Sequence, residues 1–365
     1  MPIRNIHKKP FDEGTLTKLE LYRGYLREWL PTFMNNPGVK ILQIFDFFAG
    51  PGSDLEGNPG SPLIALEAAK SALGKNMRFD APCVDLHFNE LNQTKETALR
   101  KLITQQPIGP SKLTLTVTRM PFKEAFLSLV PRMTGEVANL VFLDQNGIKQ
   151  VSRDVIERLA SLPRTDLLFF VSSALVNRFK RRPEIRGCVP IADADFERMN
   201  GGNVHRILAD SYRRWLPMTL GYFMASFSIR KGANVYGLVF GTGHPLGIHK
   251  FLRVAWKKGG DASFDIDKDG INPLEPKLFA EMNRPSKVRE YEIELRNALI
   301  YGKLRTNREV FIFGLEHGVL ASHSREAIDR MIKDGELPRQ KIHISYEAWA
   351  KSGPAEKILL KDNQS

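Results

Sequence analysis

A buried strand that runs straight into a glycine turn is the feature that most constrains how this chain can fold. Residues 39–48 are almost wholly apolar apart from Lys40, Gln43 and Asp46, as expected of a central parallel strand that is covered on both faces. A Gly-Pro-Gly turn follows at residues 50–52, and glycines let the backbone approach a ligand closely. The strand and turn predict a nucleotide-shaped cofactor. A ligand-free strand-to-helix turn is the open alternative.

The residues after the turn narrow the kind of nucleotide. A dinucleotide-binding turn has a third glycine and passes directly into a helix, but Leu55 stands at that position and a polar segment, residues 53–60, intervenes. Ser61 and Pro62 then predict an N-cap and the first residue of a helix. The turn contains no lysine to meet phosphates, as a P-loop requires. Nicotinamide and phosphate-rich nucleotides are therefore disfavoured.

Strands alternate with helices along the first 260 residues. After an amphipathic helix at 15–34, the sequence predicts strands at 39–48, 79–88, 113–118, 138–144 and 165–171. Two further strands, 220–229 and 233–242, are separated by a turn at Arg230-Lys231-Gly232 and would form an antiparallel edge. This order predicts an α/β fold, a doubly wound Rossmann-like sheet, in residues 1–260.

Residues 277–365 change character and predict a C-terminal module. A helix at 309–316 and a second at 325–333, capped by Ser322 or Ser324, precede an alternating strand at 341–345. Helix, turn, helix and strand in this order indicate a winged-helix-like module, with three basic side chains on the exposed side of the second helix. These nucleic-acid-binding candidates are Arg325, Arg330 and Lys333. The alternative is a small helical cap or protein-docking domain.

The net charge of +12 is concentrated in one segment. Residues 176–258 carry fifteen Lys and Arg against five Asp and Glu, whereas residues 41–175 carry fourteen of each kind. This concentration favours an anionic partner, nucleic acid first, while ordinary surface solvation is the alternative. The candidate contact residues here are Arg178, Lys180, Arg181 and Arg182.

The number of cysteines and the hydropathy of the chain indicate the cellular compartment in which the protein is expected. Only Cys83 and Cys188 are present, far apart in the chain, which argues against a disulfide framework and against a zinc site. The acidic run at 265–270 lacks the glutamate that a calcium loop carries at its twelfth position. No apolar run is long enough to span a bilayer, and the amino terminus has no secretory signal. We therefore expect a cytoplasmic protein without a metal site.

Three acids stand at the ends of predicted strands: Asp46, Glu90 and Asp144. In an open parallel sheet, ligands bind outside the carboxyl ends of the strands. A carboxylate at Glu90 can accept hydrogen bonds from both hydroxyls of a ribose, and a ring of acids attracts a positively charged sulfonium. The combination favours S-adenosylmethionine as the cofactor.

Several segments between about residue 15 and residue 350 together resemble the three-Cys-motif partner (TcmP) family. They are Lys18-Leu19, Tyr25-Leu26 and Trp29 of the first helix, Asp46-Phe47-Phe48-Ala49-Gly50-Pro51-Gly52, Gly60-Ser61-Pro62-Leu63, Phe142-Leu143-Asp144, Tyr236-Gly237-Leu238-Val239-Phe240, His244-Pro245-Leu246-Gly247 and Trp256. That family is similar to Rossmann-like S-adenosylmethionine-dependent methyltransferases and is typically paired with a radical-type protein that carries the three cysteines. The resemblance implies the same fold, cofactor and partner here.

By that resemblance, the cofactor-binding residues would be Asp46, Phe48, Ala49, Gly50, Pro51, Gly52 and Glu90. Asp144 would be the catalytic residue at the mouth of the site. The family pattern there resembles Asp-Pro-aromatic-Gly, whereas this chain has Asp144-Gln145-Asn146-Gly147 and so lacks an aromatic platform for a flipped base. Arg119 also stands where methyltransferases often have an acid.

Two functions therefore stay open. One is a methyltransferase that acts on nucleic acid together with a radical-type three-Cys partner. The other is a nucleic-acid-binding adaptor that keeps the fold without the reaction, with the amides of Gln145 and Asn146 able to contact a base edge.

Overall fold

The computed structural model describes most of the chain. The described residues are 10–76, 80–107, 110–145, 150–172, 176, 178, 182, 191–199, 204–231, 234–258, 264–265 and 286–360. The helices are α1 (Glu13–Met34), α2 (Ser61–Lys75), α3 (Gln93–Thr104), α4 (Phe122–Leu129), α5 (Arg153–Ala160), α8 (Asp193–Arg198), α9 (Val204–Trp215), α10 (Pro245–Lys258), α11 (Ser286–Ile300), α12 (Asn307–Glu316), α13 (Ala321–Lys333) and α14 (Tyr346–Ala350). The strands are β1 (Ile41–Asp46), β2 (Cys83–Asn89), β3 (Leu113–Thr118), β4 (Val137–Leu143), β5 (Thr165–Val171), β6 (Phe223–Lys231), β7 (Asn234–Thr242) and β8 (Phe264–Asp265).

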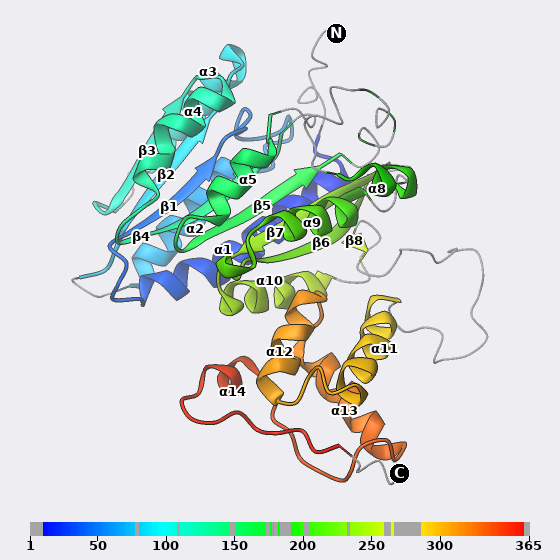
Figure 1. Ribbon diagram of the computed structural model, residues 1–365. Coiled ribbons are helices and arrows are strands. Elements are labelled where there is room, and N and C mark those ends of the chain that lie inside the picture. The colour runs from blue at the N-terminus through cyan, green and yellow to red at the C-terminus, as the bar shows by residue number, and fades with distance from the viewer. Residues whose placement is uncertain are drawn as a thin grey trace.

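One mixed sheet forms the centre of the molecule (Figure 1). Its strand order is β3-β2-β1-β4-β5-β7-β6-β8. Strands β1 to β5 pair in parallel, and β7 is antiparallel to β5 and to β6. The chain winds outward from β1 to β3 and then crosses to β4 on the other side of β1. This is a doubly wound α/β sheet, and its switch point lies between β1 and β4.

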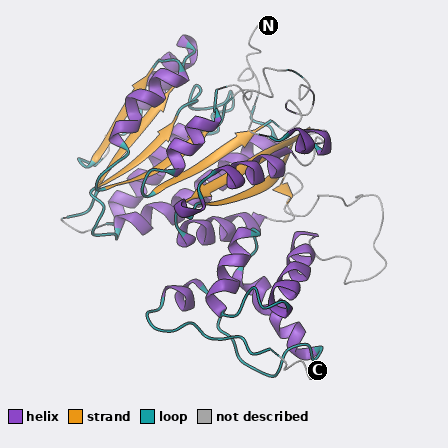
Figure 2. Cartoon of the chain, in the orientation of Figure 1, coloured by secondary structure: helices purple, strands orange, loops and turns teal. Residues whose placement is uncertain are grey.

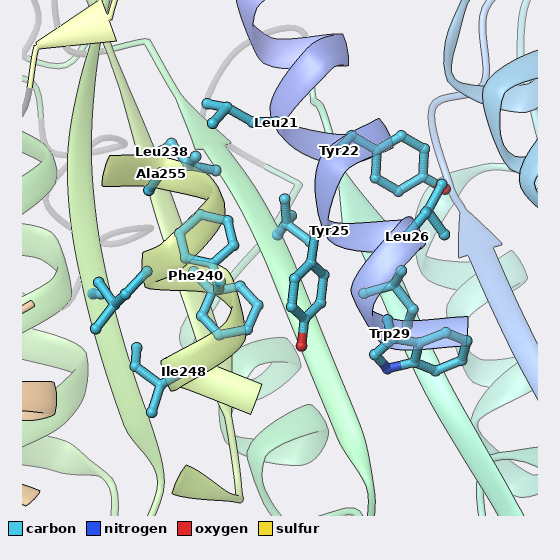
Figure 3. Close-up of a cluster of buried hydrophobic side chains, with 14 of the residues drawn as sticks. Leu21, Tyr22, Tyr25, Leu26, Trp29, Leu238, Phe240, Ile248 and Ala255 are labelled. Carbon is cyan, nitrogen blue, oxygen red and sulfur yellow. The ribbon is translucent and has the colours of Figure 1, made fainter. Parts of the chain in front are cut away.

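Alternate residues of β1 separate the two halves of the core. Leu42 and Ile44 belong to a hydrophobic cluster with α1, α2 and α10, whereas Phe45 belongs to a second cluster with α4, α5 and α9. Figure 1 shows α5 and α9 in front of the sheet and α10 between the sheet and α12. Figure 3 shows the α1 side, where Tyr25 lies near Phe240 of β7. Successive side chains of a strand point to opposite faces of the sheet. Since those of β1 are buried on both faces, β1 is a central strand.

Two local predictions need correction. Gly60, not Ser61, occupies the N-cap of α2, and the Ser61 hydroxyl donates to the buried carboxylate of Asp46 at 2.6 Å. A buried carboxylate is costly unless donors compensate its charge, which explains why the Ser61 hydroxyl bonds to Asp46. The predicted turn at 230–232 starts later, because Arg230 and Lys231 still pair with β7.

The C-terminal part, residues 286–360, consists of four helices and contains no strand (Figure 2). The strand predicted at 341–345 is wrong. The backbone there is held by side chains, since the Asn307 amide donates to the carbonyl of His343 and the His343 N–H donates to Glu356, both at 2.9 Å. Thr306 and Lys357 form only an isolated bridge. The winged-helix prediction is therefore not confirmed.

Helix α13 also begins earlier than predicted, at Ala321 rather than at residue 325. Ser324 is buried and shares a 2.6 Å hydrogen bond with the hydroxyl of Tyr291 on α11, so it serves the core and not a cap. The module packs on α10, where the indole N–H of Trp256 donates to the carbonyl of Gly318 at 3.0 Å. None of the described helices has the length and hydropathy needed to cross a membrane.

Candidate functional site

Asp46 ends β1 at the carboxyl edge of the sheet and is buried, with 1% of its surface exposed. It accepts hydrogen bonds from the Ser61 hydroxyl and, at 3.1 Å, from the Phe48 N–H. Burial raises the pKa of Asp46 from 3.8 to about 7, against the lowering effect of these two donors. The charge of Asp144 raises this pKa further and that of Lys18 lowers it. Asp46 is thus held by two donors, and its pKa depends on the charges at the mouth of the site.

The glycine turn joins the ends of β1 and β2. Gly50 has a φ of 66°, and its N–H donates to Glu90 Oε2 at 2.9 Å. Gly52 has a φ of 90°, and a Cβ there would lie 2.9 Å from the side chains of Leu99 and Leu102 on α3. Gly50 therefore points the backbone toward Glu90, whereas the missing side chain of Gly52 makes room for α3. Both glycines are in the left-handed region that other residues rarely adopt.

Glu90 follows β2 directly and is half-buried. Besides the Gly50 N–H, its second oxygen accepts from the Asn92 N–H at 2.8 Å. A carboxylate offers about four acceptor positions, so Glu90 keeps capacity for two more donors. The two hydroxyls of a ribose would supply that number.

Asn89 braces this edge, although the sequence analysis did not single it out. Its amide donates to the carbonyls of Phe47 and Met120 at 3.3 and 3.0 Å and accepts from the Met120 N–H at 3.0 Å. Its own carbonyl accepts from the Ala49 N–H at 3.0 Å. The ends of β1, β2 and β3 are thereby fixed to one another. The only sequence signal for this role is an amide at the end of an apolar strand.

The segment after the turn closes back on it. Asp54 is buried and accepts from the backbone N–H groups of Phe11 and Asn58, both at 2.8 Å. Gly60 donates to the carbonyl of Gly52 at 2.8 Å, and a Cβ on Gly60 would lie 3.0 Å from that oxygen. The polar insertion that breaks the dinucleotide pattern is therefore an ordered part of the site.

Asp144, the predicted catalytic residue, lies at the end of β4 and is paired with Lys18 of α1. The ammonium group of Lys18 also lies 5.3 Å from the centre of the Phe170 ring. About a third of the Asp144 side chain, 32%, is exposed. Lys18 was not among the predicted site residues, because 126 positions separate it from its partner.

Gln145 is buried and works within the protein. Its Oε1 accepts from the N–H groups of Gln150 and Val151 at 3.0 and 3.1 Å, while its Nε2 is buried and has no partner among the described residues. Asn146 and Gly147 lie outside the described residues. Phe48 is half-buried and stacks on Phe122 with ring centres 5.1 Å apart. Ala49 is buried, Pro51 is half-buried and Arg119 is exposed.

The structure divides the predicted nucleic-acid-binding residues. Arg178 and Arg182 are exposed, and so are Arg325 and Lys333 on α13. Arg330 is not on the exposed side as predicted, since it is half-buried and ion-paired with Glu292 of α11. The packing of α13 on α11 explains this difference. Lys180 and Arg181 lie outside the described residues.

The basic segment is less positive in three dimensions than in sequence. At least five of its fifteen basic residues form ion pairs within the described part of the chain: Arg198 with Asp195, Arg213 with Asp210, Arg214 with Asp195, Lys250 with Glu28 and Lys258 with Glu20. The last two acids belong to α1, outside the segment. Counting charges by position along the chain therefore overstated the local excess.

No protein-family model and no curated protein matches the chain. The chain is similar to the solved structure of the DUF519 protein LPL1258 from Legionella pneumophila str. Philadelphia 1, with 11% identity, 60% of this chain and 83% of that chain covered, and a TM-score of 0.34. It is also similar to spermidine synthase from Thermotoga maritima, with 11% identity, coverage of 66% and 62%, and a TM-score of 0.32. The glycopeptide N-methyltransferase MtfA with sinefungin gives 12% identity, coverage of 59% and 85%, and a TM-score of 0.27. Because all three TM-scores are below 0.5, these likenesses carry no argument about function.

Proposed function

We propose that this protein binds S-adenosylmethionine at the carboxyl edge of its sheet and transfers a methyl group to nucleic acid. The observation that carries the proposal is the hydrogen bond between the Gly50 N–H and Glu90, which places a carboxylate with free acceptor positions beside the glycine turn. The edge lies next to the switch point, where open α/β sheets bind ligands. Asp46 and Asp144 add negative charge, which suits a sulfonium.

The cofactor would supply an electrophilic methyl group. Glu90 would hold the ribose, and the turn from Phe48 to Gly52 would lie against the methionine part. Methyl transfer needs mainly alignment of the reacting atoms, and the Lys18–Asp144 pair would define the mouth where the substrate is placed. Nucleic acid as substrate is supported by the exposed Arg178, Arg182, Arg325 and Lys333. The radical-type three-Cys partner rests on the family resemblance.

Calorimetric titration with S-adenosylmethionine tests the cofactor. We expect one site per chain, and Glu90→Gln weakens binding by about ten- to a hundredfold, because it replaces one charge-assisted acceptor by a donor. Glu124→Gln, at an exposed acid on α4, is the matched control and leaves the affinity unchanged. A folded wild-type protein that releases no heat would contradict the proposal.

The alternative is a nucleic-acid-binding adaptor without catalysis. It is favoured because two predicted site residues already have partners within the protein. Asp144 is ion-paired, and Gln145 Oε1 accepts a backbone hydrogen bond. An adaptor binds DNA or RNA with an affinity that falls steeply with salt and that does not depend on the cofactor. Fluorescence anisotropy of labelled oligonucleotides at rising NaCl measures both properties.

Charge reversal locates the nucleic-acid contact under either function. Arg325→Glu with Lys333→Glu is expected to weaken oligonucleotide binding by about tenfold or more, because two phosphate contacts are lost. Lys123→Glu, at an exposed residue of α4, is the control. Equal affinity of the two variants would exclude α13 from the contact. Transfer of a labelled methyl group to the oligonucleotide would decide against the adaptor.

A further inference from the structure

A cavity lies at the amino end of β5, away from the glycine turn. It has a volume of about 230 Å³ and is enclosed by α1, the beginning of β5, the end of β7 and the first turns of α10. Its walls include the aromatic rings of Tyr25, Trp29 and Phe33. The segment His244-Pro245-Leu246-Gly247, which contributes to the family resemblance, lines the same cavity except for Pro245. The proposed cofactor site leaves this cavity unexplained.

Asp166 of β5 is the acidic group of the cavity and is buried, with 4% of its surface exposed. It accepts hydrogen bonds from the Tyr25 hydroxyl at 2.6 Å and from the Thr242 hydroxyl. The indole N–H of Trp29 lies near enough to lower the pKa of Asp166, although its geometry falls short of a hydrogen bond. Figure 3 shows the Tyr25 hydroxyl and the Trp29 indole at the same end of the buried cluster. All these donors are neutral.

The positive groups of the cavity are already engaged elsewhere. Lys250 is 3.3 Å from the carboxylate of Glu28 and donates to the Glu28 carbonyl. Arg164 donates to the backbone carbonyls of Val137 and Gly135. The N–H of Leu246 at the start of α10 donates to His244 Nδ1 at 3.0 Å. Within the described ranges, no lysine or arginine forms an ion pair with Asp166.

We propose that this cavity binds a small organic ammonium ion, with Asp166 as its counter-ion and Tyr25, Trp29 and Phe33 as its aromatic wall. A buried carboxylate without a cationic partner is costly, and an ammonium group both neutralises it and donates to its two remaining acceptor positions. Aromatic faces attract a cation by their quadrupole, most strongly where water is excluded. An anion would be repelled by the Asp166 charge, and the Tyr25 and Thr242 hydroxyls already donate to that carboxylate.

The cavity is distinct from the proposed cofactor site. Asp166 is in register with Leu140 of β4, four residues before Asp144. A strand rises about 3.3 Å per residue, which separates the two positions by roughly 13 Å along the sheet. The amine site therefore stands whether or not the chain binds S-adenosylmethionine.

Calorimetric titration of the full-length protein with benzylammonium tests the site. Benzyl alcohol and benzoate are matched probes of nearly the same size, one neutral and one anionic. We expect one benzylammonium per chain, bound about ten- to a hundredfold more tightly than either other probe, as a charge-assisted hydrogen bond implies. No binding of benzylammonium by the folded protein, or equal binding of all three probes, overturns the proposal.

Two variants assign the binding to this cavity. Asp166→Asn keeps the shape of the side chain and is expected to abolish the preference for the ammonium probe, whereas Asp154→Asn, at an exposed acid on α5, retains it. Thr32→Trp fills the cavity from α1 while leaving Asp166 intact, and it should abolish binding even if Asp166→Asn does not fold. Unchanged benzylammonium affinity in either folded cavity variant would contradict the proposal.

Discussion

Asp46 at the carboxyl end of β1 and Asp166 near the amino end of β5 are two buried carboxylates of the same sheet, and their surroundings differ in origin. Burial raises the pKa of both, to about 7 for Asp46 and about 6 for Asp166. Asp46 is held by Phe48 and Ser61, two and fifteen residues further along the chain. Asp166 is held by Tyr25 and Thr242, which are 141 and 76 residues away. The first site is built by a local turn, and the second only by the finished fold.

Alanine substitutions at Gly52 and Gly57 should destabilise the protein to different extents. We expect Gly52→Ala to lower the free energy of unfolding by about 2–5 kcal/mol, because a left-handed alanine costs about 1–2 kcal/mol and overpacking against Leu99 and Leu102 adds about 1–3. Gly57 has a similar φ of 83° with no atom within 4 Å of a Cβ, so Gly57→Ala carries the backbone cost alone. Urea unfolding measures both. If both variants lost the same unfolding free energy, α3 would have moved to accommodate the added methyl group at residue 52.

One hydroxyl donor can be removed from each carboxylate. Tyr25→Phe and Ser61→Ala should each cost about 1–3 kcal/mol of unfolding free energy at pH 8, where Asp166 and Asp46 are ionised, because a buried charge loses a donor. At pH 5 the carboxyl groups are protonated and the losses should be smaller. Urea denaturation at the two pH values checks this. If the loss of unfolding free energy were the same at both pH values, its cause would be altered packing and not the lost hydrogen bond.

The two carboxylates should also titrate in different windows. Since burial raises both folded pKa values above the ordinary 3.8, protonation stabilises the folded state, and stability is lost as pH rises to about 7 for Asp46 and about 6 for Asp166. Between pH 6 and 7, wild type should lose up to about 1.4 kcal/mol relative to Asp46→Asn. Relative to Asp166→Asn the difference should stay nearly constant there. Unfolding free energies in steps of half a pH unit distinguish the two.

The smallest expected effect concerns the mouth of the carboxyl edge. Lys18→Ala should change the unfolding free energy by less than about 1 kcal/mol, as partly exposed ion pairs contribute little. It should strengthen binding of cationic S-adenosylmethionine by up to about fivefold, because a positive charge leaves the acidic ring. S-adenosylhomocysteine lacks the sulfonium charge and should bind unchanged. Lys70→Ala, where the lysine donates to a backbone carbonyl, is the control. An equal gain for both ligands would rule out the electrostatic explanation.

Much of the fold is local enough to be predicted from sequence. The first helix was expected at 15–34 and is observed at Glu13–Met34, and the strands at 113–118 and 165–171 have the expected bounds. Apolar periodicity within each segment carries this information. The segment at 341–345 alternates like a strand, but a strand needs a neighbour, and Asn307 bonds to its backbone instead. The sequence of residues 341–345 alone does not reveal that a distant side chain will bond to this backbone.

The candidate site was predictable to the same extent. The acids Asp46, Glu90 and Asp144 were expected at strand ends, and the structure brings them to one edge of the sheet. Lys18 was missed because nothing near it in sequence marks its partner. The charge of the basic segment was overstated because two of its lysines are neutralised by Glu28 and Glu20, which lie more than two hundred residues before those lysines in the chain.

Helix α1 contacts both ends of the sheet through residues on one side, with Lys18 against Asp144 and Tyr25 against Asp166. Positions seven apart lie on the same face of a helix. Inserting one residue between them would turn the later part of the helix by about 100° and shift it by about 1.5 Å, so that only one of the two contacts could form. The number of residues between Lys18 and Tyr25 therefore matters as much for forming both contacts as the two side chains themselves.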